Sequence, residues 1–467
     1  MVAPSALDVA RLRERFAWKR YTNIARLAAY IGVLCSPFSL WALFWTSPKD
    51  YPFLSSMLWV PVATLGCVLL FSRTWKRDKF NKLLFGAGIT MRLAAAGAFV
   101  WLGFFVFGVS ADAFHYSNNG VVLASHFPAA GWAVFQPPWT SSNLIMNICG
   151  IITLVTGDAM PALMVLFSFA ALWGAYFFYR AFCIAFPHGD RGLYGLLIVL
   201  LPSLAYWSSA IGKDALEQLF IGLSAYGFAR LVTKLSGSAI LVCGIGITGA
   251  ALVRPHIGAL LAVSMLGPFT FGRAKSGWMT TSVKILLIPL LAGGTLIMIS
   301  QARSFVGVEG SDFQSNVNRL KLEGEYTNLG GSTFNQGESL PRRMLQGPFL
   351  PFRPFPWEVH NAMAAVAALE GLLLIFFAWR RRRSVKALVR RWREPYVLFI
   401  LMFIVEFSLI FSAGTSNFGI LVRERIMMVP IFLMLFCAIP QYSQPAARVS
   451  IVNRDLLLRR AVVSTAE

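Results

Sequence analysis

Charged residues are scarce in this chain of 467 residues, since only 13% are Asp, Glu, Lys or Arg. A soluble domain carries about 25% charged residues, so too little polar surface is present to cover a water-soluble globule of this size. Acidic residues are the scarcer sign, with 21 Asp and Glu against 42 Lys and Arg. Hydrophobic residues make up 57% of the chain, and its mean hydropathy is +0.62. We therefore expect lipid, rather than water, around most of the protein.

Several chemical signatures are also missing. The six cysteines form no short-range pairs, which argues against a zinc site and suggests no disulfide framework. No Walker loop, no GxGxxG motif opening a helix after a strand and no His-Glu-x-x-His motif occurs. The sequence therefore lends no support to an ATP-driven or zinc-dependent function, and we expect no cofactor and no bound metal.

Long apolar runs dominate what is present, and they predict an all-α polytopic transmembrane bundle formed by residues 1–467 as a single domain. The runs are continuous and do not alternate, which favours helices over a barrel. Since about 20 apolar residues cross the hydrocarbon core, we expect about twelve spans. They cover residues 26–46, 53–72, 84–108, 161–182, 192–208, 214–232, 239–253, 257–271, 279–300, 360–378, 396–414 and 425–441.

The net charge of +21 predicts an orientation in the membrane, and no nucleic-acid partner, because Lys and Arg stay on the cytoplasmic side. With an inner N-terminus and alternating spans, 30 basic residues fall inside and 11 outside. The basic tails 1–25 and 442–467 are then cytoplasmic, while loops 109–160 and 301–359 face outward. The apolar piece 144–156 is short for a span, so we expect a re-entrant or interfacial helix there. Loop 301–359 is polar and is predicted to act as a flap.

Acidic and basic residues at the outer ends of two spans are candidates for chemistry. Asp112 follows the third expected span, where partial desolvation of its carboxylate suits a general base; an ordinary turn aspartate is the alternative. Lys213, Asp214 and Glu217 begin a later helix. Asp214 and Glu217 share one helix face, and Lys213 is placed to meet a phosphate at the helix N-terminus. The alternative is an ordinary helix start with a snorkelling lysine.

Basic residues occur at three further outer positions. Arg254 interrupts an apolar stretch together with the adjoining His256, and charge at membrane depth is by default a functional hypothesis. Arg353 precedes a span and is either a phosphate contact or half of a rim ion pair with Glu358. Two arginines begin the last span, and we expect them to grip a phosphate in bidentate fashion; a structural Arg–Glu cluster is the alternative. These two are Arg423 and Arg425.

This layout resembles the integral-membrane glycosyltransferases of the GT-C superfamily, and it is similar to the polymerases that link polysaccharide repeat units. The shared features are an acid after an early span, a Lys–Asp pair at a later span start, an arginine at membrane depth, a polar outer flap and a terminal Arg-x-Arg. The resemblance covers most of the chain. In its Asp-x-x-x-Tyr context, Asp112 matches the family's outer-face acid, although family members place that acid after their first span.

The resemblance implies transfer of a sugar from a polyprenyl-phosphate-linked donor to a glycan or lipid acceptor. The reaction would serve cell-envelope polysaccharide or glycolipid synthesis at the outer face of a bacterial inner membrane. Asp112, or Asp214 as second choice, would take the proton from the acceptor hydroxyl. Basic residues would neutralise the leaving phosphate without a metal. They are Lys213, Arg254, Arg423 and Arg425.

Two alternatives stay open at this point. A polysaccharide repeat-unit polymerase would share the lipid-linked substrate. A transporter or lipid flippase would also have twelve spans and a broken helix pair. Against a transporter, most charges gather at one face rather than at the midplane, where Arg92 and Glu406 are the main exceptions.

Overall fold

The computed structural model describes residues 6–45, 51–75, 78–105, 112–271, 345–359, 361–414 and 417–439, with single positions at 289, 293 and 296. Every regular element in these ranges is a helix, which confirms the expected all-α class. The expected span 279–300 lies outside the described residues apart from those single positions. Residues 301–344 of the predicted flap and the tail 442–467 lie outside them entirely.

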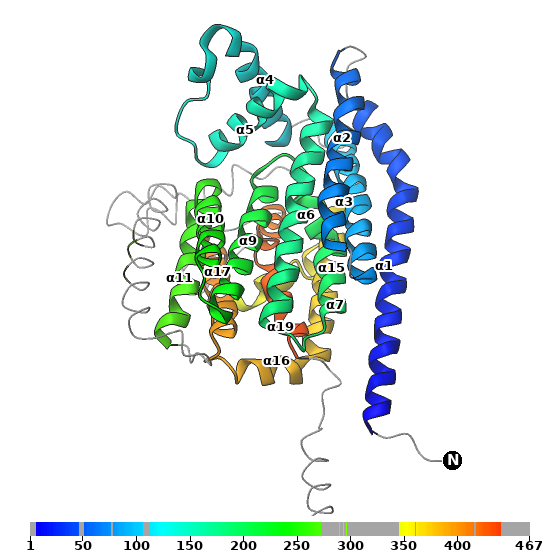
Figure 1. Cartoon of the computed structure of the whole chain (residues 1–467), viewed down its shortest axis with the longest axis vertical. Coiled ribbons are helices and arrows are strands. Elements are labelled where there is room, and N and C mark those ends of the chain that lie inside the picture. Colours follow the sequence, from blue (N-terminus) through cyan, green and yellow to red (C-terminus); the bar gives the residue numbers. More distant parts are fainter. Residues whose placement is uncertain are drawn as a thin grey trace, which may run out of the picture.

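Four long helices form one side of the bundle (Figure 1). They are α1 (Ala6–Trp45), α2 (Tyr51–Trp75), α3 (Lys79–Phe105) and α6 (Met160–Ala185). Between α3 and α6 come α4 (Asp112–Ala130), the 3-10 turn η1 (Gly131–Val134) and α5 (Ser141–Thr156). Helices α4 and α5 lie together at one end of the bundle (Figure 1). We call this the α4–α5 end of the bundle.

The rest of the bundle contains more short helices. The central ones are α7 (Arg191–Leu200), α8 (Pro202–Trp207), α9 (Lys213–Thr233), α10 (Gly237–Val253) and α11 (Pro255–Phe271). The later ones are η2 (Gly347–Phe352), η3 (Pro356–Glu358), α15 (Ala362–Arg380), α16 (Arg382–Val389), α17 (Pro395–Gly414), α18 (Phe418–Arg425) and α19 (Val429–Cys437). Helix α16 lies across the end opposite α4 and α5 (Figure 1). We call this the α16 end.

Six described helices are long and apolar enough to cross a membrane, so the chain is compatible with an integral membrane protein. These are Trp18–Leu43, Leu54–Thr74, Lys79–Phe105, Met160–Ala185, Ala362–Arg380 and Pro395–Ser412. The expected count of twelve is not confirmed. The expected span 192–208 coincides with two short helices, α7 and α8, because the chain breaks at Leu201–Pro202. Proline cannot donate the backbone hydrogen bond that would continue α7. The expected span 425–441 begins at the last residue of α18 and contains the short helix α19.

Helix α9 packs closely against α6 through small residues. A Cβ atom on Gly174 would lie 2.2 Å from the carbonyl oxygen of Gln218, and one on Gly222 would lie 2.4 Å from the carbonyl oxygen of Gly174. Only glycine permits backbones to approach so closely, as at other helix interfaces in membranes.

Just before α9, the buried Arg92 of α3 donates hydrogen bonds to the carbonyl oxygen of Ala205 and to the hydroxyl of Ser208.

A buried ion pair joins the short helices in the interior. Arg425 of α18 is fully buried, and its Nη2 lies 2.9 Å from Oε1 of Glu370 in α15. Arg425 also donates to the carbonyl oxygen of Arg353 at 2.6 Å. Glu370 in turn accepts from both the backbone N–H and the hydroxyl of Ser203 in α8. These bonds compensate two charges that burial alone would make very unfavourable.

At the α16 end, Asp190 connects four elements. Its side chain accepts from the Leu193 N–H at the start of α7, from the Tyr21 hydroxyl of α1 at 2.9 Å and from Arg381 at 2.8 Å. Arg381 also donates to the carbonyl oxygen of Phe436 in α19. The run of four arginines at residues 380–383 predicts a stop-transfer anchor that contacts lipid headgroups, but Arg381 is a buried partner of this network.

We predict that Glu370→Gln destabilises the protein by about 3–5 kcal/mol, because Arg425 then becomes an uncompensated buried charge. The measurement is thermal or denaturant unfolding of the purified protein in detergent. The matched control is Glu394→Gln, which removes the acid of an exposed pair with Arg391; such pairs contribute about 0–1 kcal/mol. Equal stability of the two variants would contradict the role assigned to Glu370.

Candidate functional site

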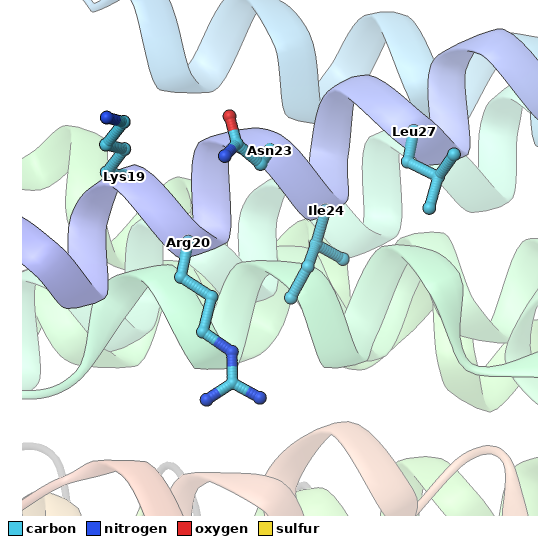
Figure 2. Close-up of a pocket in the computed structure, with 5 residues that line it drawn as sticks. All are labelled: Lys19, Arg20, Asn23, Ile24 and Leu27. Carbon is cyan, nitrogen blue, oxygen red and sulfur yellow. The ribbon is translucent and has the colours of Figure 1, made fainter.

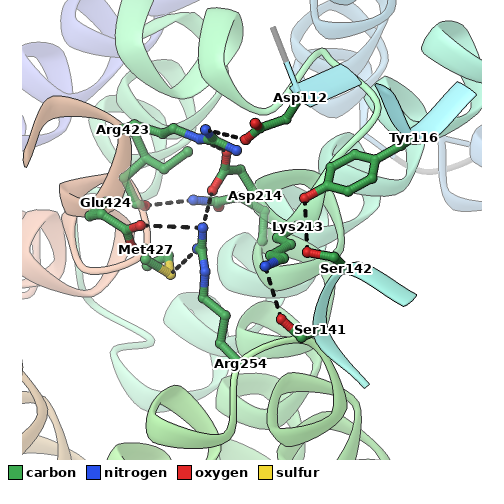
Figure 3. Close-up of polar contacts among 12 residues, drawn as sticks. Asp112, Tyr116, Ser141, Ser142, Lys213, Asp214, Arg254, Arg423, Glu424 and Met427 are labelled. Carbon is green, nitrogen blue, oxygen red and sulfur yellow. Dashed lines mark hydrogen bonds and ion pairs between the residues drawn. The ribbon is translucent and has the colours of Figure 1, made fainter. Parts of the chain in front are cut away.

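Charged side chains from four separate parts of the chain meet at the α4–α5 end (Figure 3). Asp112 is the first residue of α4, and Lys213 and Asp214 are the first residues of α9. Arg254 sits between α10 and α11, while Arg423 is in the last turn of α18. The structure thus brings together five of the residues that the sequence selects. We call these five, with Glu217 and Glu424, the charged cluster.

Asp214 is the hub of the charged cluster. Its side chain is 5% exposed, and both carboxylate oxygens are occupied. Oδ1 accepts from Arg254 at 2.9 Å, and Oδ2 accepts from Nε of Arg423. Because this carboxylate is buried and each of its oxygens is bonded to an arginine, Asp214 is suited to positioning the arginines rather than to acting as a base.

Arg254 is the most deeply placed base of the charged cluster. Its side chain is buried, and besides Asp214 it forms an ion pair with Glu424 at 3.3 Å and contacts the Met427 sulfur at 3.1 Å. Pro255 follows it as the first residue of α11, where the missing N–H of proline costs nothing. Burial raises the pKa of Glu424, and the charge of Arg254 opposes that shift.

Asp112 and Arg423 form the accessible edge of the charged cluster. Nη1 of Arg423 donates to Oδ2 of Asp112 at 2.9 Å, and the two side chains are 28% and 56% exposed. Asp214 raises the pKa of Arg423 against the effect of burial, and Asp112 raises it further, so this guanidinium stays charged. Within the described part of the chain, Oδ1 of Asp112 and Nη2 of Arg423 make no hydrogen bond.

Local sequence explains why the second arginine of the Arg-x-Arg pair is absent here. Asn417 caps α18 by accepting from the N–H groups of Gly419 and Ile420, which fixes where this helix starts. Residues two apart on a helix do not face the same side. Arg423 therefore points to the charged cluster, whereas Arg425 points to Glu370 in the interior.

Lys213 lies beside the charged cluster, and its ammonium group donates to the hydroxyl of Ser141 in α5 at 2.9 Å. Burial lowers the pKa of Lys213, and the positive charge of Arg254 lowers it further, while Asp112 opposes the shift. The preceding Gly212 provides no side chain to cap α9, so the N-terminus of this helix adds partial positive charge at the same place.

Glu217 lies one turn below Asp214 and is 0% exposed. Neither of its carboxyl oxygens has a hydrogen-bond partner among the described residues. A buried polar group without a partner carries its full desolvation cost. Glu217 is therefore the least compensated member of the charged cluster.

Two other predicted residues are not members of the charged cluster. His256 is in the first turn of α11, with its ring centroid 5.8 Å from that of Phe411, and it lies near enough to Arg254 and Lys213 for their charges to act on it. Arg353 forms an ion pair with Glu358 and donates a hydrogen bond to the side-chain oxygen of Gln346 at 2.6 Å. It is not part of the charged cluster. Its pair with Glu358 is the rim pair that the sequence left as the alternative.

Some partners had only weak sequence signals. Ser141 and Ser142 begin α5, within the predicted loop 109–160, and nothing in the sequence distinguishes them from other polar residues there. The Ser142 hydroxyl lies 3.4 Å from the Tyr116 hydroxyl. Glu370 has a clearer signal, because it is a carboxylate in the middle of an apolar run, where charge is by default functional or structural. It belongs to the interior pair and not to the charged cluster.

Two hollows in the surface contain none of these residues. One, of about 380 Å³, runs along α1 and is lined by Lys19, Arg20, Asn23, Ile24 and Leu27 (Figure 2). The other, of about 600 Å³, lies between α15, α16 and α19. Figure 2 shows Arg20 and Ile24 pointing to the same side of α1. All five lining residues of that hollow come from a single helix, so it does not enclose a ligand.

The charged cluster combines an exposed carboxylate, a partly exposed arginine and a desolvated lysine around a buried ionic hub. This set is able to bind an anion and to accept a proton beside it. No group of three or more His, Cys, Asp or Glu residues suited to a metal ion occurs among the described residues. No protein-family model, curated protein or solved structure matches the chain.

We predict that Glu217→Leu stabilises the folded protein by about 1–3 kcal/mol, because it removes a buried polar group that lacks a partner. Thermal unfolding in detergent measures the change. Glu370→Leu is the comparison, since it removes a buried carboxylate whose two oxygens are both bonded, and it is expected to destabilise. Destabilisation by Glu217→Leu would mean that Glu217 is bonded in the folded protein.

Proposed function

We propose that the protein is a membrane glycosyltransferase that moves a sugar from a polyprenyl-phosphate donor to a glycan or lipid acceptor at the outer face of a bacterial inner membrane. The observation that carries the proposal is the contact between the exposed Asp112 and Arg423 above the buried Asp214. It provides a proton acceptor next to a cation that is fixed in place. The family resemblance of the sequence layout supports the same class.

In the proposed reaction, Oδ1 of Asp112 removes the proton from an acceptor hydroxyl. The resulting oxygen attacks the anomeric carbon, and a new glycosidic bond forms as the bond to the phosphate oxygen breaks. The electron pair stays on that oxygen, so polyprenyl phosphate leaves with an additional negative charge. Nη2 of Arg423 and the ammonium of Lys213 neutralise this charge, which is the form of electrostatic stabilisation that contributes most to many enzymes.

The buried members of the charged cluster have supporting roles in this proposal. Asp214 holds the Arg423 guanidinium through Nε and Asp112 binds it through Nη1, so Nη2 is the nitrogen that has no hydrogen bond to a described residue. Arg254 balances the charge of Asp214 and Glu424 from below. We propose no direct phosphate contact for Arg425 or Arg353, because both are engaged by carboxylates elsewhere.

The proposal requires the α4–α5 end to face outward. In a Cys35→Ser background, Ser125→Cys on α4 is therefore expected to react with a membrane-impermeant maleimide in intact cells. Arg383→Cys on α16 is the matched control and is expected to react only after lysis. Both side chains are exposed. The reverse pattern would contradict the orientation and remove the outer-face assignment.

Asp112→Asn is predicted to lower turnover by about 10²–10⁴-fold, which is the usual contribution of a general base. Folding is expected to be unaffected, because the Asp112–Arg423 pair is largely exposed. The assay follows transfer of radiolabelled sugar from short-chain prenyl-phosphate hexoses and pentoses to a native membrane extract. Asp158→Asn, at the same end but outside the charged cluster, is the control and is expected to keep normal turnover.

A transporter or lipid flippase is the second candidate function, and one specific observation favours it. Arg92 is buried at the middle of α3, and its guanidinium hydrogen-bonds neutral oxygens of Ala205 and Ser208 rather than a carboxylate. If the Asp112→Asn and Asp214→Asn variants both transfer sugar as fast as the wild type does, neither carboxylate is the base that the proposed glycosyl transfer requires. Unchanged turnover in both variants would therefore reject the proposed reaction in favour of transport.

A further inference from the structure

The larger hollow lies at the α16 end, far from the charged cluster. It has a volume of about 600 Å³ between α15, α16 and α19, and Phe352 at the end of η2 also lines it. This volume falls within the range of about 300–1,000 Å³ typical of ligand sites. We call it the α16 groove.

One wall of the α16 groove is a column of aromatic rings. Phe432 and Phe436 are one turn apart on α19, with ring centroids 4.9 Å apart, and Phe352 lies 5.6 Å from Phe432. Val385 and Val389 line the groove from α16. The column extends from the α16 end toward the interior. An extended apolar chain fits along such a wall, whereas a compact polar solute gains nothing from it.

The rim of the α16 groove is basic. Arg382, Lys386 and Arg390 line it at intervals of four residues, so they form one stripe along α16 and the turn that follows. All three are exposed. Neither Lys386 nor Arg390 forms an ion pair with a described residue. Arg382 stacks over the Trp379 ring at 5.3 Å, and tryptophan at a membrane interface is a common anchor.

The α16 groove thus has an apolar interior and a rim of exposed basic side chains, a combination that fits an amphipathic molecule with an anionic headgroup. We propose that the α16 groove binds an anionic phospholipid, with one acyl chain along the aromatic column and the phosphate headgroup on Lys386 and Arg390. An amphipathic helix with a basic polar face lies at the lipid headgroup level, and basic residues there attract anionic lipids. This binding site is independent of the proposed glycosyl transfer.

The test uses the full chain purified in mild detergent with equal amounts of dioleoyl phosphatidylglycerol and dioleoyl phosphatidylcholine. Native mass spectrometry then measures how much of each lipid stays bound. The wild type is expected to retain phosphatidylglycerol preferentially. Each Lys or Arg near the headgroups contributes about fivefold to the attraction, so the double variant Lys386→Gln, Arg390→Gln is expected to bind about 30-fold less tightly.

A second double variant controls for general attraction between charges. Arg383→Gln with Arg393→Gln removes two exposed cations from the same end that do not line the α16 groove, and it is expected to retain the lipid. Val389→Trp fills the groove and is expected to abolish retention while keeping every charge. Equal retention of the two lipids, equal losses in the two double variants, or full retention by Val389→Trp would each overturn the proposal. Displacement of the lipid by millimolar glycerol 3-phosphate would also overturn it, because the acyl chain would then contribute nothing.

Discussion

The double ion pair of Asp214 is the interaction on which the α4–α5 end depends. One buried carboxylate binds Arg254, 40 residues away in the sequence, and Arg423, 209 residues away. Both arginines must satisfy a charge that burial would otherwise make very unfavourable. The start of α9, the α10–α11 turn and α18 are therefore held in one arrangement. Asp112 then joins the assembly through Arg423 at its exposed edge.

Helix α18 links this assembly to the interior because its two arginines face opposite ways. Arg423 belongs to the charged cluster, and Arg425 belongs to the pair with Glu370, which also holds α8 through Ser203. Because α18 is short and has one arginine in each network, a displacement of the Arg425–Glu370 pair would also move Arg423 in the charged cluster, and the reverse. In the proposed enzyme, this would make the position of the accessible guanidinium depend on packing deep in the bundle.

The sequence predicts much of this arrangement, for identifiable reasons. Charged side chains are unfavourable next to lipid, so the few that interrupt or flank the apolar runs are conspicuous in the sequence. The five residues of the charged cluster that the sequence selects are of this kind: Asp112, Lys213, Asp214, Arg254 and Arg423. The all-α class follows from continuous apolar runs. Hydropathy does not resolve where such a run breaks, so residues 192–208 are expected as one span although they form α7 and α8, and the count of twelve is not confirmed.

Pairing within the bundle was harder to predict than position along the chain. Arg425 was expected beside Arg423, because sequence proximity suggests a joint grip, yet helix geometry separates them. Arg381 is expected in a basic anchor at the lipid headgroups, but the distant Asp190 provides a buried partner. In both cases the deciding partner is remote in the sequence. No local pattern identifies such a partner.

The central claim is that the charged cluster binds the phosphate of a prenyl-phosphate ligand. Binding of a prenyl phosphate that carries no sugar tests this claim most directly. Purified protein should bind farnesyl phosphate more tightly than farnesol in calorimetric titrations. Because hydrogen bonds to charged groups contribute about 1.5–3 kcal/mol, Arg423→Gln should weaken binding of the phosphate by roughly 10-fold or more, with farnesol unaffected. Equal binding of the phosphate and the alcohol, or unchanged phosphate binding by Arg423→Gln, would contradict the account.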